Sequence, residues 1–153
     1  MDRRDLLKTS LTSAGALAVG SMLARTAFAG EPSDEAPTDA LGTVVNTAAA
    51  CIKAGEVCLA HCIKELSTCN TSMANCNRRV HEMLATCNAM LRLAAMRSDL
   101  ARKFAALCAE ACANCEAACA EHRAHWAHGM HLECKACFEA CVECRKACLA
   151  LAA

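Results

Sequence analysis

The sequence has 153 residues, of which 56% are hydrophobic, and its sixteen Lys and Arg residues are balanced by sixteen Asp and Glu residues. No basic stripe is present, and one Trp and three Phe residues offer little for base stacking, so a nucleic-acid-binding protein is excluded. Fifteen cysteines dominate the composition, and they all lie between Cys51 and Cys148. Any function assigned to the chain has to explain these thiols.

The N-terminal segment has the pattern of an export signal. The pair Arg3-Arg4 is followed by a mildly apolar run over 11–24 and by the small-residue site Ala27-Phe28-Ala29. We therefore expect residues 1–29 to be a twin-arginine (Tat) signal peptide, which places the mature protein in the periplasm. The apolar run is short and interrupted, which argues against a membrane span. Removing residues 1–29 leaves the rest of the chain with a net charge of −2, because four basic and two acidic residues are lost.

The rest of the chain divides into a short linker and one helical domain. Two prolines within residues 30–39 indicate a flexible tether. Residues 40–153 contain no proline and are rich in helix-forming residues, which predicts an all-α fold. Turn residues divide this domain into helices over about 40–69, 73–96, 99–124 and 130–151. The short connections predict an antiparallel up-down-up-down four-helix bundle.

The cysteines follow one rule in all four helices. At about 100° per residue, steps of three, four, seven or eleven residues return a side chain to the same face of a helix. Met83 and Met90 share the cysteine face of the second helix. These are the positions that normally hold Leu and Ile in a bundle, so we expect a cysteine-lined core. The predicted core ligands are Cys51, Cys58, Cys62, Cys69, Cys76, Cys87, Cys108, Cys112, Cys115, Cys119, Cys134, Cys137, Cys141, Cys144 and Cys148.

Thiols in this arrangement favour copper(I). Disulfides fit poorly, because cysteines three or four apart on one helix project side by side and their number is odd. Zinc prefers closed sites of four thiolates, each with a charge of −2, and several such sites would repel one another in a dry core. Copper(I) is a soft ion, and one thiolate per ion leaves no net charge. We therefore expect many Cu(I) ions, on the order of one per cysteine.

Two other classes of protein have to be compared with a copper-binding protein. A structural helical oligomer stabilised by zinc or by disulfides remains the alternative. An enzyme is not expected, because the stacked thiols are near-equivalent and no nucleophile–base pair is recognisable among them.

The two ends of the predicted bundle differ in chemistry. The end where the first helix begins carries an apolar plug, made of Val44, Leu91, Leu100, Phe104 and Leu149. The end where the first helix finishes gathers imidazoles and thioethers, which bind Cu(I) less tightly than paired thiolates and would admit it to the core. These predicted mouth residues are His61, Met73, His122, Met130 and His131. His125 and His128 are expected to face solvent.

An apolar face remains on the outside of the first helix. Ile52, Leu59, Ile63 and Leu66 form this second stripe beside the cysteines. Such a surplus apolar face predicts packing against another copy of the chain.

A Tat-type signal followed by four helices with inward Cys-x3-Cys and Cys-x2-Cys ladders resembles the bacterial copper storage proteins. The most specific segments run from Cys58 to Cys62, from Cys108 to Cys119 and from Cys134 to Cys148. The resemblance implies a homotetramer of four-helix bundles that holds many Cu(I) ions. It also implies that the exported protein buffers copper or supplies it to a copper-requiring enzyme or chaperone. By the same resemblance, His61 and Met73 match mouth positions of the family.

Overall fold

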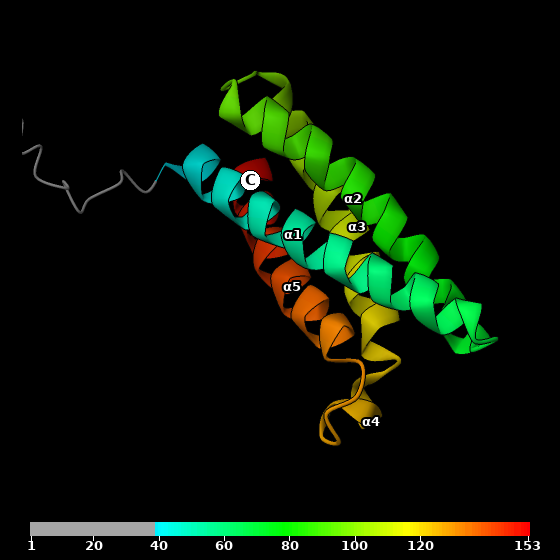
Figure 1. The fold of residues 1–153 in the computed structure, drawn as a ribbon. Coiled ribbons are helices and arrows are strands. Elements are labelled where there is room, and N and C mark those ends of the chain that lie inside the picture. Colours follow the sequence, from blue (N-terminus) through cyan, green and yellow to red (C-terminus); the bar gives the residue numbers. More distant parts are fainter. Residues whose placement is uncertain (1–38) are drawn as a thin grey trace, which may run out of the picture. The chain divides into compact units, whose positions relative to one another are not determined.

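The computed structural model describes residues 39–153 and confirms an all-helical bundle (Figure 1). The predicted signal peptide and residues 30–38 of the predicted tether lie outside the described residues. Four long helices and two short ones make up the described part of the chain. They are α1 (Ala40–Ser67), η2 (Thr71–Met73), α2 (Ala74–Ala95), α3 (Leu100–Ala120), α4 (Arg123–Trp126) and α5 (Leu132–Ala152).

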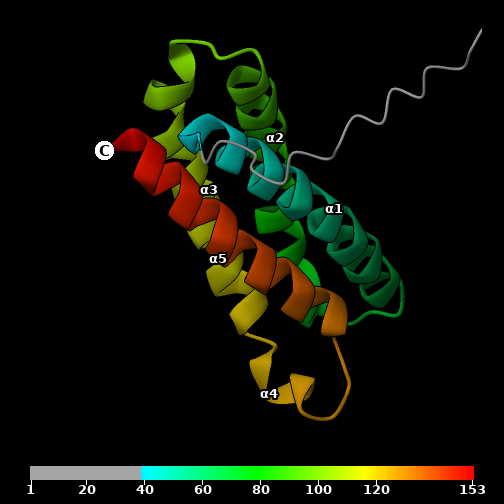
Figure 2. The same ribbon diagram turned by 90° about the vertical axis from the view of Figure 1, so that its left-hand side faces the viewer.

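The four long helices surround a common axis. Each packs against two neighbours, in the order α1, α2, α3 and α5 around the bundle. Short connections make consecutive long helices antiparallel, and α5 brings the C-terminus back to the end where α1 begins (Figures 1 and 2). The inward face of each helix therefore meets three others along the bundle axis.

Side-chain caps fix the starts of two helices. Asp39, which we had expected in the tether, caps α1 by accepting a hydrogen bond from the Leu41 backbone N–H at 3.1 Å. Asp39 also forms an ion pair with Arg97, just beyond α2, and so ties two connections together. The Ser98 hydroxyl accepts a hydrogen bond from the Leu100 N–H at 3.2 Å, where α3 begins.

The first helix ends before Cys69, so the prediction that Cys69 lines the core is wrong. The Cys69 N–H donates to the Leu66 carbonyl at 3.0 Å, and the Asn70 N–H donates to the Glu65 carbonyl at 3.2 Å. This is a Schellman ending, and Cys69 takes its left-handed position with a φ of 64°. Leaving the helix turns Cys69 away from the face of Cys62, and its side chain is exposed.

The third predicted helix is interrupted near its end. The predicted helix extended to residue 124, whereas α3 ends at Ala120 and a turn separates α3 from α4. Gly129 and His131 then adopt left-handed φ values of 73° and 52° before α5 begins at Leu132. This path of the chain between α3 and α5 leaves several histidines close together at this end of the bundle.

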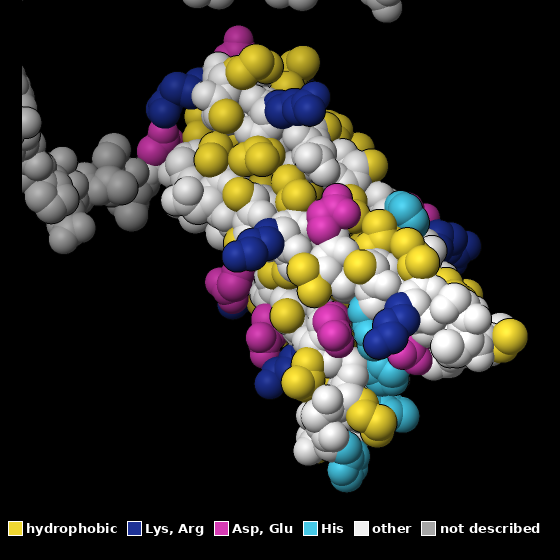
Figure 3. Space-filling view, viewed as in Figure 1, with side chains coloured by type: hydrophobic (Ala, Val, Ile, Leu, Met, Phe, Trp, Pro, Cys, Tyr) yellow, Lys and Arg dark blue, Asp and Glu magenta, His cyan; other side chains and the backbone are white. Residues whose placement is uncertain are grey.

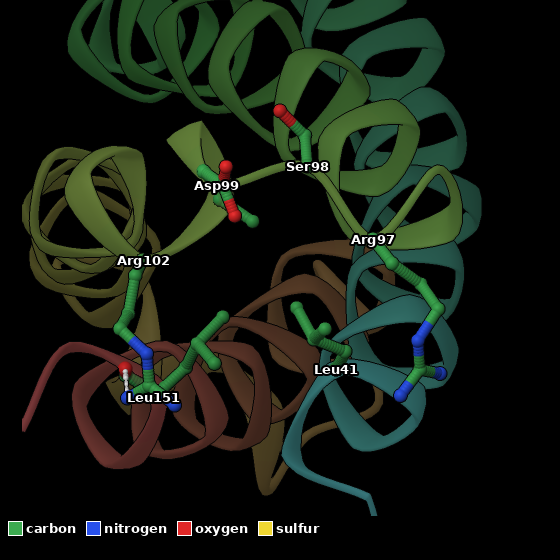
Figure 4. Close-up of a pocket in the computed structure, with 7 residues that line it drawn as sticks. Leu41, Arg97, Ser98, Asp99, Arg102 and Leu151 are labelled. Carbon is green, nitrogen blue, oxygen red and sulfur yellow. Dashed lines mark hydrogen bonds between the residues drawn. The ribbon is translucent and has the colours of Figure 1, made fainter.

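The opposite end is closed by part of the predicted plug together with residues that were not predicted (Figure 4). Val44 is buried as predicted, and Leu91 and Phe104 pack partly buried against the core, whereas Leu100 and Leu149 are exposed. Ala101 and Leu151, which were not predicted, are buried there. Helical phase explains the difference, because Leu151 lies three residues after Cys148, on its face, whereas Leu149 lies only one residue after it.

A small cavity of about 170 Å³ remains at this closed end, between Leu41, Ala101 and Leu151. The Arg102 guanidinium donates to the Leu151 carbonyl at 2.9 Å and holds the end of α5 in place (Figure 4). This end of the bundle is therefore fastened by a hydrogen bond as well as by apolar contacts.

Helix α1 is long and apolar enough, by length and composition alone, to cross a membrane. Its inward face is built into the bundle through buried Cys51, Cys58 and Cys62, and its exposed residues include Lys53 and Glu56. Figure 3 shows hydrophobic and charged side chains mixed over the face formed by α1 and α2. A lipid-facing helix would not carry such a mixed surface.

Candidate metal centre

Fourteen cysteines form the centre of the bundle. Each has an exposed fraction of 0%, and all fifteen cysteines of the chain are free thiols. Helices α3 and α5 contribute nine of the fourteen, and α1 and α2 contribute five. These core thiols are Cys51, Cys58, Cys62, Cys76, Cys87, Cys108, Cys112, Cys115, Cys119, Cys134, Cys137, Cys141, Cys144 and Cys148.

Four of these thiols form what we call the mouth tetrad, namely Cys58, Cys62, Cys76 and Cys134. Their sulfur atoms all lie within 4.8 Å of one another. The Cys58 sulfur is 3.8 Å from both the Cys76 and the Cys134 sulfur, and the Cys76 sulfur is 3.7 Å from that of Cys119. Ligands from α1, α2 and α5 thus converge on one place without any backbone irregularity.

A second group, the inner tetrad, lies deeper in the bundle. It consists of Cys51, Cys87, Cys112 and Cys144, one from each long helix, again within 4.8 Å of one another. The Cys87 sulfur is 3.6 Å from that of Cys112 and 3.9 Å from that of Cys144. Separations of this size allow one soft ion to be held by two or three sulfurs, and one sulfur to bridge two ions.

The two tetrads are joined by thiols of α3 and α5. Cys115, Cys137 and Cys141 form a triad, in which the Cys115 and Cys137 sulfurs are 3.7 Å apart. Cys137 also groups with Cys58, and the Cys141 sulfur lies 3.6 Å from that of Cys51. The thiols are therefore continuous from the mouth tetrad to the inner tetrad.

The thiols are unequal in acidity. Hydrogen bonds with Cys119 and other thiols, and then burial, raise the pKa of Cys58, and thiols around Cys87 raise its pKa in the same way. Hydrogen bonds with Cys108 and its neighbours instead lower the pKa of Cys144. Nine of the thirteen core thiols with a shifted pKa have it raised, so the metal-free core holds most of its protons.

Histidines gather above the mouth tetrad, at the end near α4 (Figure 3). His61 Nε2 and His131 Nδ1 are 2.9 Å apart, and the His122 and His125 rings lie 5.4 and 5.3 Å from the His131 ring. Burial, followed by the nearby His61 and His122, lowers the pKa of His131. The His131 imidazole is therefore disposed to be neutral, which is the form that binds metal ions.

An open cavity of about 540 Å³ lies beside these histidines. His61, Glu65, His125, His131 and Glu133 are among the residues that line it. His125, which we expected to face solvent, is exposed but belongs to this cavity. Glu133, whose carboxylate lies 3.6 Å from His61 Nδ1, was missed, although it follows His131 by only two residues.

The predicted mouth residues therefore differ in depth. Met73 is fully buried, and His122 is only 6% exposed. The His122 Nε2 atom is buried without a hydrogen-bond partner. Met130 is 47% exposed and lines the same open cavity as His61 and His131. Cys69, which was predicted as a core ligand, is exposed and lies outside the core.

A four-helix bundle whose interior is lined by contiguous thiols defines a protein that binds many soft metal ions. Residues 38–153 match the family described as Copper storage protein, and the chain belongs to that family. Its core binds multiple copper ions on cysteines, and the family is one of storage proteins and not of enzymes. No match is found among curated proteins.

Two solved structures from Streptomyces lividans are similar. A cytosolic copper storage protein with five coppers is 26% identical, with a TM-score of 0.63, over 74% of this chain and 92% of that chain. The copper storage protein Ccsp, loaded with 10 copper equivalents, is also 26% identical, with a TM-score of 0.64, over 80% of this chain and 92% of that chain. Both of these proteins are described as copper storage proteins loaded with several copper ions, in agreement with the family match.

Proposed function

We propose that the chain stores Cu(I) at about one ion per core thiol, about fourteen in all, and buffers or supplies copper after export to the periplasm. The observation that carries this proposal is the continuity of the thiols from the mouth tetrad to the inner tetrad. A structural metal site needs only one closed set of four ligands, whereas this core repeats its ligands along the whole bundle.

Charge supports a ratio close to one ion per thiol. An isolated thiolate in a dry core is costly, and each Cu(I) cancels one negative charge. The core has no Lys or Arg among its buried residues, so the metal ions would be the only source of positive charge there among the described residues. Copper bound in this ratio leaves the filled core neutral.

Copper would enter at the histidine end of the bundle. His122 is buried and its Nε2 atom has no partner, although it neighbours His131 at the edge of the open cavity. An unpaired buried imidazole costs stability, which suits a group that holds a metal ion in passing. His61, His131 and the outer Met130 would hand Cu(I) to buried Met73 and the mouth tetrad.

Export and association complete the proposal. Residues 1–29 would direct the chain through the Tat route, which moves folded proteins and would protect the thiols until copper arrives. A homotetramer would cover apolar groups such as Ile63 and Val57, which are 55% and 53% exposed on α1. A copper-requiring enzyme or a chaperone would then receive the stored ions.

Anaerobic titration of the reduced chain with Cu(I), against a competing chelator, tests the storage proposal. We expect saturation near fourteen equivalents, because fourteen thiols are buried in the core. Saturation at two to four equivalents would contradict the proposal and favour zinc-like sites. The variants Cys69→Ser and Cys137→Ser form a matched pair, since Cys69 is exposed and Cys137 is buried. Only Cys137→Ser should lower the capacity.

The time course of loading tests the proposed role of His122. We expect His122→Ala to slow copper uptake severalfold and to leave the final capacity unchanged, because the imidazole would only relay the ion. His81→Ala is the control, since His81 is exposed on α2. Stopped-flow mixing with a Cu(I)–chelator complex measures both rates. Equal rates for the two variants would remove His122 from the route.

A further inference from the structure

Met83 places a thioether sulfur among the core thiols. Its side chain is fully buried, and its Sδ atom lies 3.4 Å from the Cys51 sulfur. The Cys51 thiol donates a hydrogen bond to this thioether. When a Cu(I) ion replaces the Cys51 proton, which is released to water, the Met83 lone pair that accepted the hydrogen bond faces the ion.

The neighbouring helix makes room for this contact. Gly55 is buried on α1, and a Cβ atom there would lie 2.6 Å from Met83 Cε and 2.9 Å from Leu84 Cδ2. Glycine inside a helix costs about 1 kcal/mol relative to alanine. The sequence therefore carries a destabilising residue at the one place on α1 that lets the Met83 side chain cross toward Cys51.

The Met83 thioether lies at a height in the core where α2 has no cysteine. On α2 no cysteine lies between Cys76 and Cys87, and Met83 occupies this gap. Cys51 belongs to the inner tetrad and lies 3.6 Å from Cys141, which belongs to the triad leading to the mouth. The Cys51 sulfur thus lies within 3.6 Å of both the Cys141 sulfur and the Met83 sulfur, at the place where the triad joins the inner tetrad.

A thioether also has a chemical advantage at this junction. A third thiolate would add a second uncompensated negative charge to a Cu(I) site in a dry core, whereas a thioether adds a ligand and no charge. It also carries no proton to be displaced. A Cu(I) ion bound by two thiolates and one thioether therefore suits a crowded core better than one bound by three thiolates.

Simple core filling is the ordinary role of methionine, and Met90 provides a comparison. Met90 is equally buried and lies seven residues further along the same face of α2. Among the described residues, it takes part in no sulfur–sulfur hydrogen bond like that of Met83 and Cys51. A comparison of Met83 with Met90 therefore distinguishes a metal ligand from a residue that only fills space in the core.

We infer that Met83 Sδ is a copper ligand, which binds Cu(I) together with the Cys51 and Cys141 thiolates at the junction between the outer and inner thiols. The inference rests on the proposed storage of Cu(I). One weaker, thioether-containing site at this place allows ions to pass between the two halves of the core, since an all-thiolate site would hold them more firmly.

Selenium spectroscopy of the copper-loaded full chain tests this assignment. Wild type, Met83→Leu and Met90→Leu are produced with selenomethionine, loaded with Cu(I), and measured by X-ray absorption at the selenium edge. We expect the selenium–copper signal to fall by about one contact per chain in Met83→Leu and to be unchanged in Met90→Leu. Both changes conserve side-chain volume, so both variants should fold, which circular dichroism checks.

Gly55→Ala provides a second variant that removes no sulfur. Its new methyl group displaces the end of Met83, so the selenium–copper signal should fall although every ligand is still present. An unchanged signal in Met83→Leu, or an equal loss in Met83→Leu and Met90→Leu, would overturn the assignment. The copper content of the wild type is measured on the same samples. A wild type that holds only a few ions would refute the storage proposal itself.

Discussion

Filling the core with Cu(I) raises the midpoint of thermal unfolding by about 20 °C or more above that of the reduced, metal-free chain. A ligand present at a hundred times its dissociation constant stabilises the folded state by about 2.7 kcal/mol per site. A few such sites equal the whole stability of an ordinary domain, about 5–15 kcal/mol. At several degrees per kcal/mol for a domain of this size, the expected shift is large.

The metal-free core has little else to stabilise it. Its largest fully buried side chains are Met73, Met83, Met90 and Leu151, and thiols and alanines fill most of the remaining space. A fully buried Leu or Met contributes about 1.5–3 kcal/mol, and a smaller side chain contributes less. We therefore expect the reduced chain to be only marginally stable without copper.

Anaerobic circular dichroism at 222 nm, recorded during heating of the metal-free and copper-loaded chain, measures this effect. A control in which the inner tetrad, Cys51, Cys87, Cys112 and Cys144, is changed to serine should lose part of the rise. Identical unfolding midpoints with and without copper would show that the ions bind outside the folded core. A rise in the wild type that the serine variant fully retains would place them away from the inner tetrad.

The sequence predicted the bundle because one period governs the cysteines. Spacings of three, four and seven residues between Cys108 and Cys119, or between Cys134 and Cys148, are meaningful only on a helix with one inward face. Fourteen of the fifteen predicted core thiols are indeed buried. Periodicity is reliable within a helix because each residue adds a fixed rotation.

The same arithmetic fails where a helix ends. Cys69 was placed on the core face by extending the first helix two residues too far, and the left-handed turn at its end cannot be read from rotation alone. The third helix was likewise drawn through the turn that begins at Glu121. Helix endings depend on backbone hydrogen bonds that several residues can support, so the sequence signal is weak there.

Contacts between side chains of different helices could also not be predicted from the sequence. Periodicity put Met83 on the inward face but could not show that Gly55 lies opposite or that Cys51 lies within 3.4 Å. The closeness of His125 and Glu133 to His61 depends on the path of the chain around α4. Such contacts are set by the relative heights of the helices along the bundle, which spacing within one helix does not determine.

Copper-loaded and metal-free chains should respond to pH in opposite directions. In the metal-free chain most shifted core thiols, among them Cys58, Cys87 and Cys141, have a raised pKa, through hydrogen bonds with neighbouring thiols and through burial. Unfolding exposes them to water, where a thiol ionises near pH 8.5. Their contribution to stability is therefore complete below about pH 8.5 and is lost as the pH rises above it. The four thiols with a lowered pKa offset only part of this loss.

In the loaded chain, protons compete with copper for the same sulfurs. Copper binding releases a proton from each thiol that becomes a ligand, so the affinity falls about tenfold per pH unit for each proton displaced. For a site with two thiolates the fall is about a hundredfold per unit, and copper leaves the core as the pH drops. Between pH 5 and pH 10, the unfolding midpoints of the two forms should therefore approach each other at acid pH, where the loaded chain loses copper, and diverge at alkaline pH, where the metal-free chain loses stability. A copper affinity, measured against a competing chelator, that stays constant between pH 8 and pH 5 would mean that thiolates are not the ligands, because each ligating sulfur takes up a proton when its metal ion leaves.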